Sequence, residues 1–112
     1  MIKVEIQYNQ GYIESFSVSG HAGFNSAGED IYCAGVSAVT QTALLGLMEH
    51  MSREPEYRIK NGLMECKLPF GLTEEDREKA QLILTTMEKG LMSMEQAYAG
   101  YLKVLVRRSQ NV

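Results

Sequence analysis

The residues best suited to covalent chemistry are a cysteine and a histidine twelve positions apart, Cys33 and His21. His21 follows an expected strand, and Cys33 lies near the start of an expected helix. If Asp30 is the N-cap of that helix and Ile31 its first residue, Cys33 occupies the first turn. There the unpaired backbone N–H groups and the positive end of the macrodipole favour a thiolate. The spacing therefore predicts an unusually nucleophilic sulfur.

A glycine-rich loop separates the two residues and is long enough to bring the imidazole back to the sulfur. A Cys–His pair supplies a nucleophile, a base that deprotonates it and an acid that protonates the leaving amine. Backbone N–H groups near Cys33 can also stabilise the oxyanion that forms when sulfur attacks a carbonyl. The hypothesis from these residues is peptide-bond hydrolysis.

Each of these residues also has a structural explanation. A cysteine in a helix of small residues is commonly a buried apolar filler, and a histidine that ends a strand is commonly a hydrogen-bonded loop residue. Asp30 is explained as a helix cap alone. Ser37, one turn after Cys33, is explained as a hydroxyl that bonds back to its own helix. Spacing by itself leaves both explanations open.

The same region resembles the signature of a known family, the bacterial ribosomal-processing cysteine proteases (Prp). The matching residues are Gly20-His21-Ala22-Gly23, Gly28, Asp30-Ile31, Cys33-Ala34 and Val36-Ser37. The resemblance extends over most of the chain. It implies a cysteine endopeptidase that removes a short N-terminal extension from a large-subunit ribosomal protein, the twenty-seventh in standard naming.

The resemblance also implies roles for individual residues. Cys33 is the expected nucleophile, and His21 is the expected general base and acid. Asp30 would orient His21 or fix the loop, and Ser37 would hold the helix start or touch the substrate. Independently of the resemblance, the apolar Phe24 in the glycine-rich loop is either a contact for the peptide or an anchor for the loop. The expected substrate loop contains Gly20, Gly23, Phe24 and Gly28.

Beyond the single residues, the family implies a homodimer and an apolar pocket for a pair of aromatic substrate residues. It implies no cofactor and no metal. Two other functions remain open. A non-catalytic module would bind a ribosomal protein or an assembly factor through the loop and an apolar patch, without turnover and with ordinary thiol reactivity. A thiol acyltransferase or another amide hydrolase would use the same Cys–His pair on a different acyl group.

Patterns of alternating hydrophobicity predict the strands that must position these residues. Residues 2–8 and 12–19 form an expected hairpin around Asn9-Gln10-Gly11. Residues 57–60 and 63–68 form a second around Asn61-Gly62, a dipeptide that suits a type I′ turn. A last β-rich run covers residues 101–106.

Two longer segments predict helices. Residues 20–29 are expected to form a mobile loop, and the first helix follows from Ile31. The second begins after Thr73, a capping hydroxyl, with Glu74-Glu75-Asp76 as a solvated acidic first turn. The resulting order, ββαββαβ, predicts a single α+β domain over residues 1–112, with a mostly antiparallel sheet packed with two helices.

Composition narrows the class of protein and its partners. The 112 residues carry a net charge of −3, with no basic block before Arg107-Arg108, so direct nucleic-acid binding is disfavoured. The first residues lack the apolar core of a secretory signal, and we expect a cytoplasmic protein. The two cysteines and two histidines match no zinc spacing, and no metal site is expected.

Two further apolar features receive structural explanations. Ile31 to Met48 contains no charged residue, but its serine, threonine, glutamine and glycine residues argue against a membrane span. We expect a helix there that is buried on most sides. Cys66 shares a strand face with Met64 and Leu68, which predicts an inert thiol in the core.

Overall fold

The structure is a computed structural model that describes residues 1–20, 27–60 and 62–109, with only the backbone of residues 27–30. Its elements follow the expected order. They are β1 (Ile2–Asn9), β2 (Tyr12–Ser19), α1 (Ala27–His50), β3 (Glu56–Lys60), β4 (Leu63–Lys67), α2 (Glu74–Ala97) and β5 (Leu102–Ser109).

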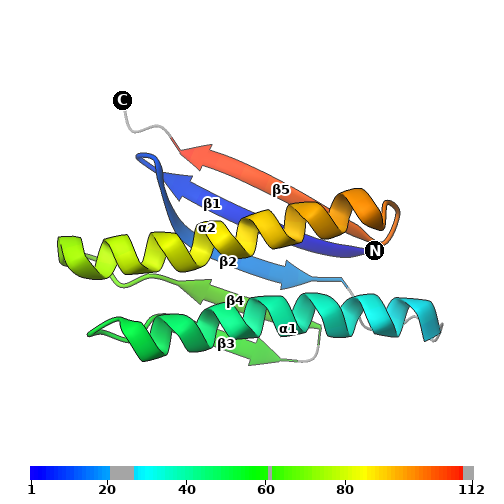
Figure 1. The fold of residues 1–112 in the computed structure, drawn as a ribbon, viewed down its shortest axis with the longest axis horizontal. Helices are drawn as coiled ribbons and strands as arrows, with labels where there is room; N and C mark the ends of the chain where they lie inside the picture. The colour runs from blue at the N-terminus through cyan, green and yellow to red at the C-terminus, as the bar shows by residue number, and fades with distance from the viewer. Residues whose placement is uncertain (21–26, 61, 110–112) are drawn as a thin grey trace.

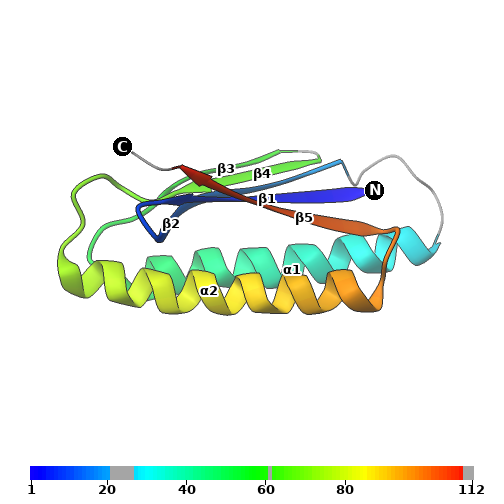
Figure 2. The same cartoon turned by 90° about the horizontal axis from the view of Figure 1, so that it is seen from above.

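The strands form one five-stranded sheet in the order β3-β4-β2-β1-β5. β1 pairs with β5 in parallel, and the other neighbouring strands are antiparallel. Both helices cover the same face of this sheet and run in opposite directions (Figures 1 and 2). The expected α+β fold with a mostly antiparallel sheet is therefore confirmed.

The core lies between the sheet and the two helices. Val4 and Ile6 point into it from β1, Leu47 from α1 and Leu91 from α2, and each is 0% exposed. Burying one such side chain fully contributes about 1.5–3 kcal/mol to the free energy of unfolding. Because one face of the sheet supplies the alternating apolar residues, both helices must dock on that face.

Glycine and its neighbours make the expected turns. Gln10 and Gly11 between β1 and β2 have φ angles of 54° and 84°, and a type I′ turn requires positive φ at both central residues. Gly62, between β3 and β4, has φ 77°. Both hairpins are confirmed, although Asn61 lies outside the described residues.

The last strand is longer than its apolar pattern predicts. β5 continues through Arg107 and Arg108 to Ser109 because β1 offers backbone partners along that length, including Tyr8 opposite Arg108. The guanidinium of Arg107 lies 3.1 Å from the Glu5 carboxylate, and that of Arg108 lies 4.2 Å from the centre of the Tyr8 ring. Because Glu5 and Tyr8 provide these contacts, Arg107 and Arg108 remain part of the strand although both are charged.

The first helix starts earlier than expected. α1 begins at Ala27, so the loop prediction is wrong for residues 27–29, and Gly28 belongs to the helix rather than to the substrate loop. Asp30 is the fourth helical residue and not the N-cap. Acidic residues suit both the cap and the first turn, and alanine is the strongest helix former. The local pattern therefore allowed two starting points.

α1 is also less buried than expected. Ile31 is 69% exposed and Leu45 is 64% exposed, and only 28% of the most apolar stretch within Ile31–His50 is buried. The prediction of a helix buried on most sides is wrong because a two-layer fold covers only one side of each helix. By length and composition this described helix could cross a membrane, a test that core helices of soluble proteins also pass.

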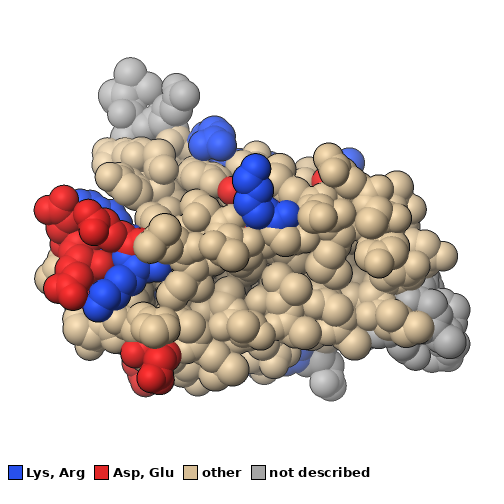
Figure 3. Space-filling model, viewed as in Figure 1, with Lys and Arg blue, Asp and Glu red and all other residues tan. Residues whose placement is uncertain are grey.

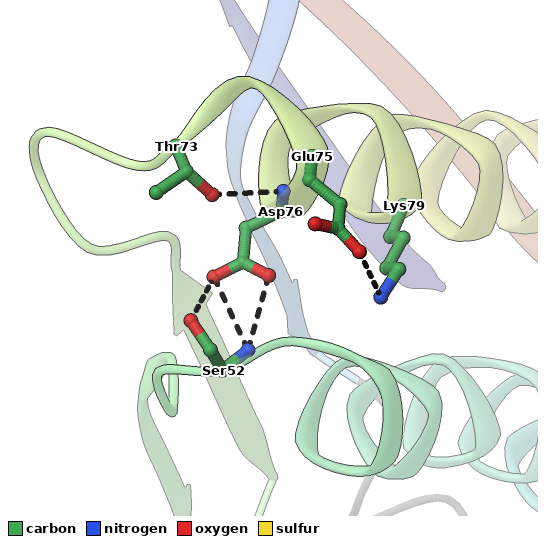
Figure 4. A network of polar contacts seen from close by, with 5 residues as sticks. All are labelled: Ser52, Thr73, Glu75, Asp76 and Lys79. Atoms are coloured by element: carbon green, nitrogen blue, oxygen red, sulfur yellow. Dashed lines mark hydrogen bonds and ion pairs between the residues drawn. The ribbon is translucent and has the colours of Figure 1, made fainter.

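At the end of the molecule where α1 stops and α2 begins, one carboxylate joins the two helices (Figure 4). The Thr73 hydroxyl accepts a hydrogen bond from the backbone N–H of Asp76, at 3.1 Å, which confirms the predicted cap. The Asp76 carboxylate in turn accepts hydrogen bonds from the hydroxyl and the backbone N–H of Ser52. Asp76 is 4% exposed, so its prediction as part of a solvated helix start is wrong.

We expect Asp76→Asn to lower the melting temperature at neutral pH, because the variant weakens the acceptor that Ser52 uses. The hydrogen bonds from Ser52 hold the pKa of the Asp76 carboxyl below its ordinary value of 3.8. The stabilisation is therefore complete above pH 3.8 and is lost as the pH falls through the folded-state pKa. Thermal unfolding from pH 7 to pH 2 should show the difference between the two proteins shrinking in acid.

A suitable control for this series is Glu75→Gln. The Glu75 side chain is 78% exposed and pairs with Lys79 at 3.1 Å, and exposed pairs of this kind contribute little. Its melting temperature should stay near that of the wild type. An Asp76→Asn protein as stable as this control at neutral pH would contradict the role of the carboxylate.

Candidate active site

The two elements that border the expected site in the sequence, β2 and α1, meet at one end of the molecule. There β2 ends, α1 begins, α2 ends and the N-terminus and β5 start, as both ribbon views show (Figures 1 and 2). Gly20 follows β2 and has φ 81°, a left-handed conformation that favours glycine. A Cβ at this position would lie 2.8 Å from the carbonyl oxygen of Met1. Glycine is therefore required where the chain leaves the sheet, one residue before His21.

Cys33 lies at this end on α1, and its exposure is intermediate. Its side chain packs against the edge of the hydrophobic core. Because the helix begins at Ala27, Cys33 is in the second turn, and its predicted place in the first turn is wrong. The influence of a helix end falls off within the first turn. The macrodipole is thus a weaker source of thiolate stabilisation than the sequence indicated.

Ser37 lies one turn after Cys33 on the same helix and is half-buried. In the described part of α1 the hydroxyl that bonds back along the helix belongs to Thr40, which donates to the carbonyl of Val36 at 2.8 Å. The structural explanation offered for Ser37 thus applies to Thr40, a residue that the sequence analysis did not single out.

Several predicted site residues are not placed. His21, Gly23 and Phe24 lie outside the described residues, and of Asp30 only the helical backbone is described. Of the predicted site residues that are described, Gly20 follows the end of β2 and Cys33 lies in the second turn of α1, whereas Ser37 lies near the middle of that helix.

An aromatic cluster beside Cys33 was missed by the sequence analysis. The ring of Tyr32 lies 4.8 Å from that of Tyr98 and 4.3 Å from that of Tyr101, measured between centroids. Tyr32 is on α1, Tyr98 is the C-cap of α2, and Tyr101 directly precedes β5. The available signal was the spacing of Tyr98 and Tyr101 on either side of Gly100, but only the antiparallel packing of the helices places them against Tyr32.

The second cysteine is in a different environment. Cys66 on β4 is 4% exposed, and burial raises the pKa of its thiol to about 12. The prediction of a core thiol is confirmed. Among the residues that the structure describes, no group of three or more His, Cys, Asp and Glu side chains is arranged to hold a metal ion.

The two thiols should therefore differ in reactivity. We expect iodoacetamide at neutral pH to add one carbamidomethyl group, on Cys33, and to reach Cys66 only after denaturation, because the Cys66 thiol is buried and protonated. Intact mass and peptide mapping would identify the sites. Rapid alkylation of Cys33 below neutral pH would indicate an activated thiol. Modification of Cys66 before Cys33 in the folded protein would contradict the assignment.

Comparisons with known proteins point to one family. The family model described as cysteine protease Prp matches residues 1–103. The ribosomal processing cysteine protease Prp of Bacillus subtilis (strain 168) is 36% identical over 94 residues, which cover 82% of this chain and 84% of that protein.

Two solved structures of the ribosomal processing protease Prp from Staphylococcus aureus are also similar. The complex with a substrate peptide has a TM-score of 0.83 and 27% identity, and the complex with a covalently linked product peptide has a TM-score of 0.80 and 28% identity. Each match covers 96% of this chain and 100% of the other.

Proposed function

This chain belongs to the cysteine protease Prp family, and from that premise we propose that it removes the N-terminal extension of a large-subunit ribosomal protein, the twenty-seventh in standard naming. Cys33 is the proposed nucleophile and His21 the general base and acid. The observation that carries the assignment of the nucleophile is the contrast between the two thiols. Cys33 is partly exposed near the start of α1, whereas Cys66 is buried on strand β4 of the sheet.

The proposed reaction has two halves. His21 takes the proton from the Cys33 Sγ, and the thiolate attacks the carbonyl carbon of the scissile bond. The tetrahedral intermediate collapses as His21 gives the proton to the leaving amine nitrogen, and the acyl group remains on Cys33 as a thioester. His21 then deprotonates a water molecule, whose oxygen displaces the sulfur and releases the carboxylic acid. No cofactor enters these steps.

Supporting residues are proposed around this pair. Asp30 orients His21 or fixes the preceding segment, and Ser37 holds the helix or contacts the peptide. Gly23 and Phe24 belong to the proposed substrate loop, together with Gly20 at its start. A side chain at position 20 would collide with the backbone of Met1, so glycine is required where this loop begins. Since the proposed substrate is a ribosomal protein made in the cytoplasm, the proposal also assigns the enzyme to that compartment.

The test is cleavage of a peptide taken from the N-terminus of that ribosomal protein as the same organism encodes it. Mass spectrometry should find a single cut in this peptide and none in a scrambled peptide of the same composition. Stoichiometric binding without a cut would contradict the protease assignment and favour the binding module. Equal cleavage of both peptides would contradict the ribosomal substrate.

We further propose that the chain forms a homodimer through the outer face of the two helices. On this face the charged side chains gather mainly where α1 ends and α2 begins, and much of the rest is uncharged (Figure 3). A groove of about 780 Å³ between the helices is lined mainly by apolar and small residues, including Ala38, Thr42, Gly46, Leu82, Ile83 and Gly90. A two-fold contact places a patch against its own copy, so an uncharged patch can pair without repulsion between like charges.

Leu82→Glu should shift this protein from dimer to monomer, because Leu82 is 71% exposed at the groove and the variant sets two carboxylates against each other across the two-fold axis. Sedimentation velocity at several concentrations measures the shift. Ile59→Glu on β3 is the matched control, since Ile59 is 48% exposed outside the groove. A wild-type monomer, or an equal effect of both variants, would contradict the proposed interface.

A further inference from the structure

The sheet has one face that neither helix covers (Figure 2). Side chains of a strand alternate between the two faces of a sheet, and in β1 the buried members of this alternation point toward the helices. The uncovered face therefore carries the polar members of the strands. Two ion pairs between neighbouring strands lie on it, Arg107 with Glu5 at 3.1 Å and Arg58 with Glu65 at 2.6 Å.

Charge is distributed unevenly between this face and the rest of the protein. The basic residues that alternation and register place on the uncovered face are Lys3, Arg58, Lys60, Lys67, Lys103 and Arg107, and the acidic ones are Glu5, Glu56 and Glu65. Glu14, which accepts a hydrogen bond from Asn9 at 3.3 Å, adds an acid beside the hairpin turn. Basic residues are thus in excess on this face, although the whole chain has 11 Lys and Arg against 14 Asp and Glu.

The excess is concentrated in one row across the sheet, at the end where β2 stops. In this row Lys3 is the register partner of both Ser19 and Lys103, and Leu63 is the register partner of both Ser19 and Lys60. The row therefore contains three lysines and no acid. All three lysines are exposed, and in the described part of the chain none of them forms an ion pair.

Two of these lysines are neighbours of like charge. Lys3 and Lys103 lie opposite each other on the paired strands β1 and β5, and such strands are about 4.8 Å apart. Like charges at this separation repel and destabilise a sheet. A bound anion would remove the repulsion, so this row is better suited to a complex with a polyanion than to the free protein.

The middle of the face is hollowed along β2. A groove of about 470 Å³ includes the short side chains of Ser15 and Ser17, between longer ones from β1 and β4. Lys67 is the register partner of Ser15. Serine hydroxyls and lysines are common donors to phosphate oxygens. Among the strand residues that the structure places on this face, no side chain is aromatic, so bases have no ring to stack on.

We propose that the uncovered face of the sheet binds the phosphate backbone of a structured RNA without reading its sequence. The net charge of −3 disfavours nucleic acid only as an average over the chain, whereas the fold gathers the basic residues on one face. The choice of RNA among polyanions rests on the proposed function, because a ribosomal protein assembles with RNA. The proposed dimer contact lies on the helices, so this face stays accessible in the dimer.

The test is the fluorescence anisotropy of a labelled 20-base-pair RNA duplex, titrated with the protein at several salt concentrations. The logarithm of the association constant should fall with the logarithm of the salt concentration with a slope of about −3, as expected for three or four neutralised phosphates. The double variant Lys3→Gln and Lys103→Gln should weaken binding by at least about tenfold at low salt and reduce the slope by about two. A duplex of scrambled sequence should bind equally well.

The matched control removes the same charge from the helix layer. Lys79→Gln and Lys89→Gln lie on α2, and this double variant should keep the wild-type affinity and slope. Thermal unfolding should find both double variants folded, since the altered lysines on the sheet face are exposed. Lys60→Gln with Lys67→Gln provides a second variant of the face and should also weaken binding.

Absence of binding by the wild type at low salt, or equal losses in the sheet and helix variants, would overturn the proposal. Tighter binding of polyglutamate or of anionic lipid vesicles than of the duplex would also overturn it and would assign the face to an acidic protein or a membrane surface. A wild type that binds RNA but cuts no peptide contradicts the proposed protease function alone. A wild type that cuts the ribosomal peptide but binds no RNA contradicts only the RNA-binding face.

Discussion

Cys33→Ala is expected to lower kcat/KM for the extended ribosomal peptide by at least about 10³-fold, since removing the nucleophile removes the covalent route. The fold should persist, because Cys33 is only partly buried and packs at the edge of the core. Cleavage followed by mass spectrometry and thermal unfolding of the same sample measure both properties.

The second cysteine provides the matched control for this experiment. Cys66→Ala removes a thiol that is 4% exposed, so the variant should lose some stability and keep most of its activity at a temperature where it is folded. If Cys33→Ala still trims the peptide, or if Cys66→Ala alone abolishes cleavage in a folded protein, the assignment of the nucleophile is wrong. Tight binding of the peptide by both variants without turnover by the wild type would favour the binding module.

His21→Ala is expected to lower kcat/KM by about 10²–10⁴-fold, the range associated with a positioned acid or base. The loss should be accompanied by a change in the pH profile. The bell-shaped dependence of kcat/KM on pH reports the acid and base of the free enzyme, and the variant should lose the limb that belongs to the imidazole. Added imidazole should restore part of the rate if the missing group acts in proton transfer.

The other histidine supplies the control. His50 is exposed in the last turn of α1, at the opposite end of that helix from Cys33. His50→Ala should therefore leave both the rate and the pH profile unchanged. Equal losses in the two histidine variants, or a His21→Ala enzyme with the wild-type pH profile, would show that His21 is not the base.

Local patterns predicted the elements well where each residue's environment follows from its own neighbours. The alternation of apolar and polar residues predicted β1 and β2, and the Gln10-Gly11 dipeptide indicated the turn between them. The Thr73 hydroxyl caps α2 as expected. These features depend on hydrogen bonds and side-chain directions within a few residues, so the sequence contains the information directly.

The predictions from sequence were wrong or incomplete where a contact with a distant residue, or two equally suitable local conformations, decided the structure. Ala27, rather than Ile31, starts α1, because acidic residues suit a first turn as well as a cap. Asp76 is buried because Ser52, at the end of the other helix, donates to it. The tyrosine cluster was missed for the same reason, since its members come from three separate elements.

By itself, the sequence determined the order of strands and helices, the alternating core positions of β1 and β2 and the resemblance to a cysteine protease family. Those properties arise from short-range periodicity and from residue types at fixed spacing. Only the tertiary structure decided that β5 lies parallel to β1, that one side of α1 stays exposed, and that Tyr98 and Tyr101 meet Tyr32 beside Cys33. Such contacts join residues that are far apart in the chain, and they form only when the sheet and both helices pack into two layers.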